Sequence, residues 1–507
     1  MTDFSAGRRF ALVQPKAWAL RRLSAILLSI VALACIVVLE LRFVGLDVEN
    51  TSVGDTPVTV YNLPSDDPKP PVIIAHGFAG SRQMMDQIAV SLARQGFLVA
   101  SVDLPGHGRN QAPMLPDITN IDGTTEQLVD AVEQVADAVV GRPDSAGPVS
   151  FVGHSMATDI VIRASQRRDD VGGVVAISMY STAVTETSPE ALLVLSGATE
   201  GRLRGVGLEA ARQIDPEAQE GMTVTSDGVI RRTSAAPFVG HVGVLYAPHS
   251  LNEITDWLRN ATNSGGQARL DQTGWIAGAL FVALVLLIWP LSKLVPARDA
   301  AAVYIPRRTF LMCLLAPIPV VLLIAALPVV GLYGKAAFGS LALILAAWGG
   351  IQLALLRKAG IAFQTPEWSG ALFYLGCAFT FALALDRYGA AFMPSGERGL
   401  VALTLLLGTV PVMLADTMLV NGASIWRRLL TRFALFVGLA SAMAVKPTEL
   451  GLAFTVIPVM VLFFLVYGTM AMWIAARRGP GGVALGKAVV LAWAIAASTP
   501  MFLTASP

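Results

Sequence analysis

The chain has 507 residues, of which 54% are hydrophobic and only 14% are charged. Its mean hydropathy of +0.60 is too apolar for an ordinary soluble enzyme and predicts that part of the chain lies in a lipid bilayer. The 37 Lys and Arg residues nearly balance the 36 Asp and Glu residues, so the net charge is +1. No basic surface for nucleic acid is expected, and a nucleic-acid partner is excluded.

The first apolar run covers residues 23–46 and follows two arginines, as the core of a secretory signal peptide would. Its apolar part is longer than a signal core, and no small-x-small cleavage site follows before Glu40 and Arg42. We therefore expect residues 1–46 to be a cytoplasmic N-terminus and an uncleaved transmembrane anchor. A cleaved signal peptide is the alternative.

Residues 47–272 alternate between short apolar runs and amphipathic stretches, which predicts a mostly parallel sheet with helices on both faces. Several runs consist almost wholly of apolar residues, as expected of strands buried on both faces. The expected strands are 56–63, 71–78, 97–104, 148–155, 172–181 and 191–197, and the clearest helices are 80–96 and 124–140.

The stretch PVSFVGHSMATDIVIRA predicts a strand, a tight turn at Ser155 and a helix, which is the setting of a nucleophile elbow. Small neighbours let strand and helix approach closely, and the helix N-terminus helps hold developing negative charge. The pattern resembles the G-x-S-x-G motif of the α/β-hydrolase family: Gly153 and Ser155 match, His154 lies between them, and Ala157 replaces the last glycine. Taken alone, the match leaves open that Ser155 is only a helix N-cap.

Two further segments resemble the same family. IIAHGFAG ends a predicted strand with His76 and Gly77, like the family's His-Gly turn, and SVDLPGHGRN resembles its Asp-x-x-Gly-His-Gly segment. The resemblance covers residues 56–260 and implies an α/β-hydrolase domain. It also implies an oxyanion hole made by the backbone N–H groups of Phe78 and Met156.

A serine needs a base to take its proton, and the base needs an acid to orient it. The family's chain order places both partners after Ser155, where only His241 and His249 provide an imidazole. His241 comes before the last amphipathic helix, where the family has its base, so we expect His241 in this role and keep His249 as the alternative.

The segment ALLVLSGATEGRL resembles the family's strand-Gly-x-x-Asp segment. Gly197 matches, and Glu200 stands where an aspartate is usual, so we expect Glu200 to be the acid and keep Glu186 as the alternative. The connection between the expected strands 172–181 and 191–197 is short and leaves no room for a large cap. We expect an open pocket, covered by the membrane domain or by lipid.

From residue 273 onward, apolar segments of about 20 residues recur to the end, which predicts an all-α membrane domain of about eight helices over residues 273–507. The expected spans are 274–294, 309–331, 336–356, 369–386, 398–420, 429–446, 452–475 and 485–504. Asp416 is the main ionisable group within them; it either serves a function or reaches water at the cytoplasmic end of its span.

Basic residues near the spans set the orientation, because Lys and Arg are retained on the cytoplasmic side. With a cytoplasmic N-terminus, the cytoplasmic segments hold 17 Lys and Arg residues, Arg432 and Lys487 included, and the opposite short loops hold 4. We therefore expect a multi-pass protein of the bacterial inner membrane, with the hydrolase-like domain on the extracytoplasmic face.

Together these features predict a membrane-anchored serine hydrolase that cleaves an ester, with a lipid or acyl substrate, through an acyl-enzyme. Acyl transfer is a variant of the same chemistry. A transport or channel protein with a non-catalytic, hydrolase-like recognition or gating module is the alternative. The three cysteines lie in apolar runs, and we expect no metal and no cofactor. The bilayer is the expected partner, and the oligomeric state stays open.

Overall fold

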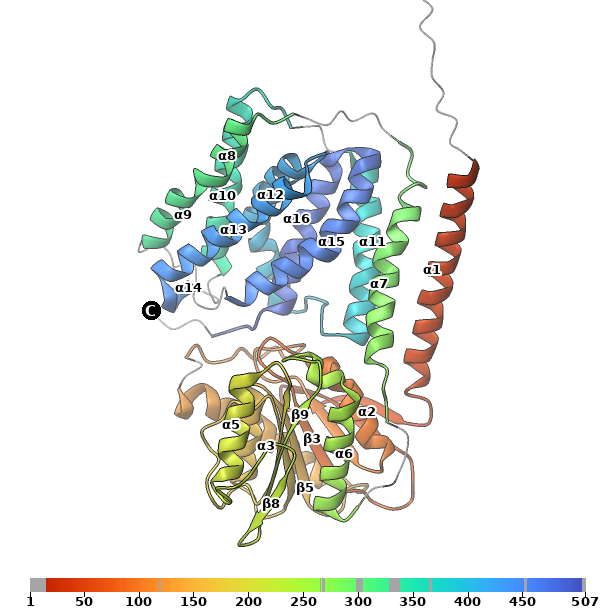
Figure 1. Cartoon of the computed structure of the whole chain (residues 1–507), viewed down its shortest axis with the longest axis vertical. Coiled ribbons are helices and arrows are strands. Elements are labelled where there is room, and N and C mark those ends of the chain that lie inside the picture. Colours follow the sequence, from red (N-terminus) through yellow and green to blue (C-terminus); the bar gives the residue numbers. More distant parts are fainter. Residues whose placement is uncertain are drawn as a thin grey trace, which may run out of the picture.

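The protein is described here from a computed structural model, in which a sheet domain lies against one side of a layer of apolar helices (Figure 1). The first helix, α1 (Pro15–Leu41), packs along α7 (Gly274–Leu291) in that layer. The structure describes residues 15–117, 120–264, 266, 270–297, 304–327, 338–363, 367–450 and 454–503.

The sheet has nine strands in the order β1-β2-β4-β3-β5-β6-β7-β9-β8. The central six, from β4 to β9 in this order, are parallel, and the strands at both edges pair antiparallel. The mostly parallel sheet and its six expected strands are thus confirmed. The bounds are β1 (Asp47–Val53), β2 (Thr56–Asn62), β3 (Pro71–Ala75), β4 (Leu98–Val102), β5 (Val149–His154), β6 (Val171–Ile177), β7 (Ala191–Gly197), β8 (Thr223–Ser226) and β9 (Val229–Ala236).

Helices cover both faces of the sheet because alternate strand residues point to opposite sides. In β3, Ile73 packs on the side of α3, α4 and α5, whereas Val72 and Ile74 pack on the side of α2 and α6. The connection from β6 to β7 contains no helix, so the expected lack of a large cap is confirmed. The bounds are η1 (Arg82–Met85), α2 (Asp86–Arg94), η2 (Ile121–Thr125), α3 (Glu126–Val140), α4 (Ala157–Ser165), α5 (Gly201–Arg212), η3 (Gly243–Tyr246) and α6 (Pro248–Thr262).

Within the described residues, nine segments are long and apolar enough to cross a membrane, which agrees with one anchor and eight later spans. The chain therefore has the make-up of a multi-pass membrane protein. The last span runs from Pro480 to Ser498, so our expectation of 485–504 was wrong at both ends. The other helices are α8 (Arg307–Leu315), α9 (Pro317–Ala326), α10 (Phe338–Lys358), α11 (Trp368–Tyr388), α12 (Glu397–Val420), α13 (Ile425–Val445), α14 (Pro447–Leu450), α15 (Val456–Arg478) and α16 (Pro480–Ser498).

The earlier start of α16 changes the interpretation of two charged residues. Lys487 lies inside this helix and is buried, where its ammonium contacts the carboxylate of Asp416 and donates to Thr417 Oγ1 at 3.1 Å. Arg432 Nε lies 3.7 Å from the same carboxylate. Asp416 is therefore buried and paired between spans, and counting Lys487 as a cytoplasmic loop residue was wrong.

The loops that follow β3 and β4 contact the helical layer directly. Arg109 forms a 2.6 Å ion pair with Asp386 at the end of α11, and the Ala391 N–H donates to Ser81 Oγ at 2.9 Å. Past α16, Met501 exchanges two backbone hydrogen bonds with Gly106 and Met114. These loops lie at the carboxyl ends of the parallel strands, so that edge of the sheet faces the layer of apolar helices (Figure 1). We call this layer of helices the membrane domain.

The buried pair predicts an asymmetric response to mutation. Asp416→Leu leaves Lys487 without its carboxylate in an apolar interior, and we expect a loss of about 3 kcal/mol in stability. The double variant Asp416→Leu with Lys487→Met removes both charges, so its melting temperature in detergent should lie above that of the single variant. Equal melting of the single and double variants would contradict the pairing.

Candidate active site

Ser155 occupies a strained turn between β5 and α4. Its φ of +53° lies in the left-handed region, which a non-glycine residue rarely adopts. Strand and helix approach so closely here that a Cβ on Gly153 would lie 2.5 Å from the Ala157 carbonyl oxygen. Ala157 is fully buried as the first residue of α4, so alanine fits where the hydrolase motif has its last glycine.

The structure brings Ser155, His241 and Glu200 together from three different loops. His241 Nε2 lies 2.9 Å from Ser155 Oγ, and His241 Nδ1 lies 2.7 Å from Glu200 Oε1. Since a carboxylate only accepts, Nδ1 carries the proton and Nε2 accepts from the serine hydroxyl. This is the arrangement in which an imidazole takes the proton of a serine as the serine attacks.

Glu200 is held rigidly at the start of α5. Its Oε2 accepts from the Gly197 N–H at 2.6 Å and from the Ser178 hydroxyl at 2.7 Å. Burial favours the neutral acid, but the hydrogen bonds from His241, Gly197 and Ser178 outweigh burial and lower the pKa of Glu200. The carboxylate is therefore ionised and fixed in orientation, as its partner imidazole requires.

Ser178, which follows β6 directly, was not among the residues expected at the site. Ser178 is fully buried, has a φ of +53° and donates its backbone N–H to the Leu195 carbonyl at 2.6 Å. This strained conformation directs its hydroxyl to Glu200. A serine at the end of a strand matches no sequence motif. Its hydrogen bond to Glu200 depends on the left-handed backbone conformation, which only the structure shows.

Two of the motif histidines support the site and do not react. His154 donates from Nε2 to the His241 carbonyl at 2.9 Å, which anchors the loop that carries the base. His76 accepts the Leu104 N–H at Nε2 and donates from Nδ1 to the Gly77 carbonyl. Burial lowers the pKa of His154 to about 4 and also lowers that of His76, so both are neutral at pH 7.

The expected oxyanion donors flank the serine. A Cβ on Gly77 would lie 3.0 Å from Ser155 Cβ, so the turn that presents the Phe78 N–H touches the nucleophile. Met156 directly precedes α4, where backbone N–H groups are free of helical acceptors. In the described part of the chain, neither of these N–H groups has a hydrogen-bond acceptor, which leaves both available for an oxyanion.

The alternative base and acid lie elsewhere. His249 Nε2 is bonded to Ser234 Oγ at 2.8 Å and lies 3.8 Å from Glu253. Glu186 is exposed in the loop between β6 and β7. The Nδ1 of His241, which the acid must contact, is already hydrogen-bonded to Glu200. The geometry therefore favours His241 over His249 as the base and Glu200 over Glu186 as the acid.

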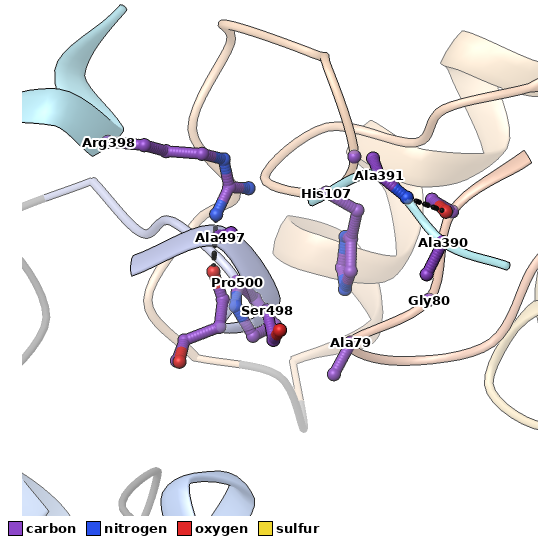
Figure 2. Close-up of a pocket in the computed structure, with 12 residues that line it drawn as sticks. Ala79, Gly80, His107, Ala390, Ala391, Arg398, Ala497, Ser498 and Pro500 are labelled. Carbon is purple, nitrogen blue, oxygen red and sulfur yellow. Dashed lines mark hydrogen bonds between the residues drawn. The ribbon is translucent and has the colours of Figure 1, made fainter. Parts of the chain in front are cut away.

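A small, partly open cavity of about 30 Å³ lies beside the oxyanion turn (Figure 2). Ala79, Gly80 and His107 line it from the sheet domain, and Arg398 and Pro500 line it from the membrane domain. A space of this size holds one or two water molecules, so it is no substrate pocket. Residues of both domains therefore meet beside the oxyanion turn.

Over the described ranges, no group of three or more His, Cys, Asp or Glu side chains is arranged to hold a metal ion. The histidines of the site are committed to hydrogen bonds with the protein, as described above. The chemistry that the arrangement offers is that of an activated serine.

One family model matches part of the sheet domain. The family model described as serine aminopeptidase, S33, matches residues 66–220, a segment that includes Ser155 and Glu200 and ends before His241. This match confirms the resemblance to α/β-hydrolases. No curated protein matches the chain.

Three solved structures are similar to part of the chain. A predicted CIB-like hydrolase from Thermoplasma acidophilum is 19% identical, with 42% of this chain and 98% of that chain covered at a TM-score of 0.34. TT1662 from Thermus thermophilus is 16% identical, with 44% and 99% covered at a TM-score of 0.32. The epoxide hydrolase VrEH1 from Vigna radiata is 20% identical, with 27% and 41% covered at a TM-score of 0.22.

The buried histidines predict that acid destabilises the protein. Burial lowers the pKa of His107 to about 3 and that of His154 to about 4, whereas an unfolded histidine titrates near about 6.5. Below about pH 6.5 only the unfolded state gains these protons. The free energy of unfolding is therefore constant above about pH 6.5 and falls as the pH decreases below it. At pH 5 the loss is about 2 kcal/mol per histidine.

The melting temperature of the full chain, measured between pH 7 and pH 5, checks this expectation. His107→Asn keeps a donor for the Pro105 carbonyl and removes the titrating ring, so the drop on acidification should shrink. The matched change His249→Asn, at a half-exposed histidine, should leave the drop as in the wild type. A drop that His107→Asn does not reduce would show that His107 is not the titrating group.

Proposed function

We propose that this α/β-hydrolase domain, joined to a membrane domain, is a membrane-anchored serine hydrolase that cleaves an ester through an acyl-enzyme. The hydrogen-bonded chain from Ser155 through His241 to Glu200 carries the proposal. A binding module has no need of a serine in a strained turn, a base at 2.9 Å and a buried acid. Acyl transfer to an acceptor other than water uses the same site.

In the first half of the proposed reaction, Ser155 Oγ attacks the ester carbonyl while its proton passes to His241 Nε2. The carbonyl oxygen becomes an oxyanion, which the N–H groups of Phe78 and Met156 stabilise. As the tetrahedral intermediate collapses, the ester C–O bond breaks and His241 gives the proton to the leaving alcohol. The acyl group remains on Ser155.

In the second half, His241 takes a proton from water, whose oxygen attacks the acyl carbonyl, and then returns the proton to Ser155 as the acid leaves. An acceptor alcohol in place of water gives acyl transfer. Glu200 stabilises the imidazolium in both halves and fixes the tautomer of His241. Its pKa lies below the ordinary value, so it supplies this charge at neutral pH.

The proposed orientation places this domain outside the cytoplasm, on a bacterial inner membrane. The sheet domain adjoins the lower ends of α1, α7 and α11 in Figure 1. By the bounds of these helices, the ends expected to be extracytoplasmic are Leu41, Gly274 and Tyr388. Basic pairs such as Arg427 with Arg428 lie at the other ends of the spans. This distribution supports a cytoplasmic N-terminus.

Labelling of the detergent-solubilised protein with a fluorophosphonate probe tests the proposed function. The wild type should be labelled, Ser155→Ala should not be, and His241→Ala should lose at least about a hundredfold in labelling rate, the usual size of base catalysis. Ester hydrolysis should fall in parallel, with an aminoacyl nitroanilide run alongside because the family model is described as an aminopeptidase.

The acid is tested by a matched pair of glutamate variants. Glu200→Gln keeps the shape of the side chain and loses the charge that stabilises the imidazolium, so kcat should fall at least about tenfold. Glu186→Gln makes the same change in an exposed loop and should leave kcat unchanged. The reverse result would move the acid to Glu186, and a folded wild type that no fluorophosphonate labels would exclude the serine-hydrolase proposal.

A further inference from the structure

Three phenylalanines form a contact between the oxyanion turn and the membrane domain. The ring of Phe78 stacks on that of Phe454 with centroids 6.2 Å apart and an interplanar angle of 13°. Phe502, beyond the end of α16, lies 6.4 Å from the same ring and is buried. The residue that presents an oxyanion N–H is thus packed against side chains from the membrane domain.

Phe454 leaves part of its surface uncovered. It lies two residues before Val456, where α15 begins, and its exposed fraction is 51% although it contacts Phe78. Phe454 therefore offers an uncovered apolar surface next to Phe78, the residue of the expected oxyanion turn. A hydrophobic group attached to the reacting carbonyl can therefore lie against it.

Exposed apolar side chains also border the other loops of the site. Phe238 and Val242 flank His241 in the chain and are 98% and 50% exposed, and Tyr180, two residues after Ser178, is 68% exposed. All three follow carboxyl ends of parallel strands, at the edge of the sheet that faces the membrane domain. Exposed apolar side chains on several loops of one site fit contact with lipid or with an apolar ligand.

We propose that the substrate is a long-chain acyl ester carried by a membrane lipid, and that Phe454 of the membrane domain forms the wall against which its acyl chain lies. The inference rests on the proposed serine-hydrolase function and deepens it. The carbonyl reaches Ser155 from the membrane side, and the chain extends along Phe454 toward the bilayer. The membrane domain then contributes part of the substrate site in addition to anchoring it.

The proposal predicts that Phe454→Ala loses activity toward a long-chain ester and keeps activity toward a short-chain ester. The full chain is reconstituted in vesicles of phosphatidylethanolamine and phosphatidylglycerol and given para-nitrophenyl palmitate or para-nitrophenyl butyrate. The wild type should prefer the palmitate. In Phe454→Ala the ratio of kcat/KM for palmitate to kcat/KM for butyrate should fall about tenfold, as expected when one aromatic contact with an apolar chain is lost.

Phe433→Ala is the matched control, because Phe433 lies within α13 and is 65% exposed without contacting the site. It should leave the ratio at the wild-type value. A wild type that prefers butyrate, or a Phe454→Ala protein that melts normally with an unchanged ratio, would overturn the acyl wall and leave the hydrolase proposal intact. Failure of the wild type to react with fluorophosphonate or with either ester would overturn both.

Discussion

A buried arginine joins the two domains at the carboxyl edge of the sheet. Arg398, at the start of α12, donates to the carbonyl oxygen of Gly106 in the sheet domain at 2.7 Å and to those of Ala496 and Thr499 at 3.0 and 2.6 Å. A buried guanidinium is tolerated only where its donors find acceptors, and here both domains supply them. Because Gly106 belongs to the loop after β4, this contact fixes the carboxyl edge of the sheet against the membrane domain. The contacts of Phe78 with Phe454 and Phe502 lie at the same edge of the sheet.

The active-site loops are built on strain and burial. Ser155 and Ser178 both adopt left-handed backbone conformations, and burial keeps His154 and His76 neutral. Such features cost free energy, and they persist where the surrounding structure determines them. The parallel strands supply that support, since each of these residues follows or ends a strand that is hydrogen-bonded on both sides. The reacting groups are therefore held in place before any substrate binds.

The sequence predicted the parts of the fold that rest on continuous apolar patterns. Strands β3 to β7 are buried on both faces, and their runs were recognised, whereas β9 was missed because Arg231 and Arg232 interrupt it. Arg231 is buried nonetheless, since its guanidinium donates to the Ala210 carbonyl and to Gln213. The residues expected in the triad came from family-like segments. Ser178 and Phe454 had no such signal, because their places depend on a backbone angle and on contact between segments far apart in the chain.

A single helix would tether the sheet domain and still leave it free to rotate above the bilayer. Here the chain enters the sheet domain from α1 and leaves it into α7, while Arg109 pairs with Asp386 and Arg398 holds Gly106 at further points. These attachments come from several helices, so the sheet domain is held in one orientation relative to the membrane domain. An active site that takes its substrate from lipid needs that fixed orientation, because the acyl chain must meet Phe454 while the carbonyl meets Ser155. In the proposed binding mode, the membrane domain forms part of the substrate site in addition to holding the sheet domain.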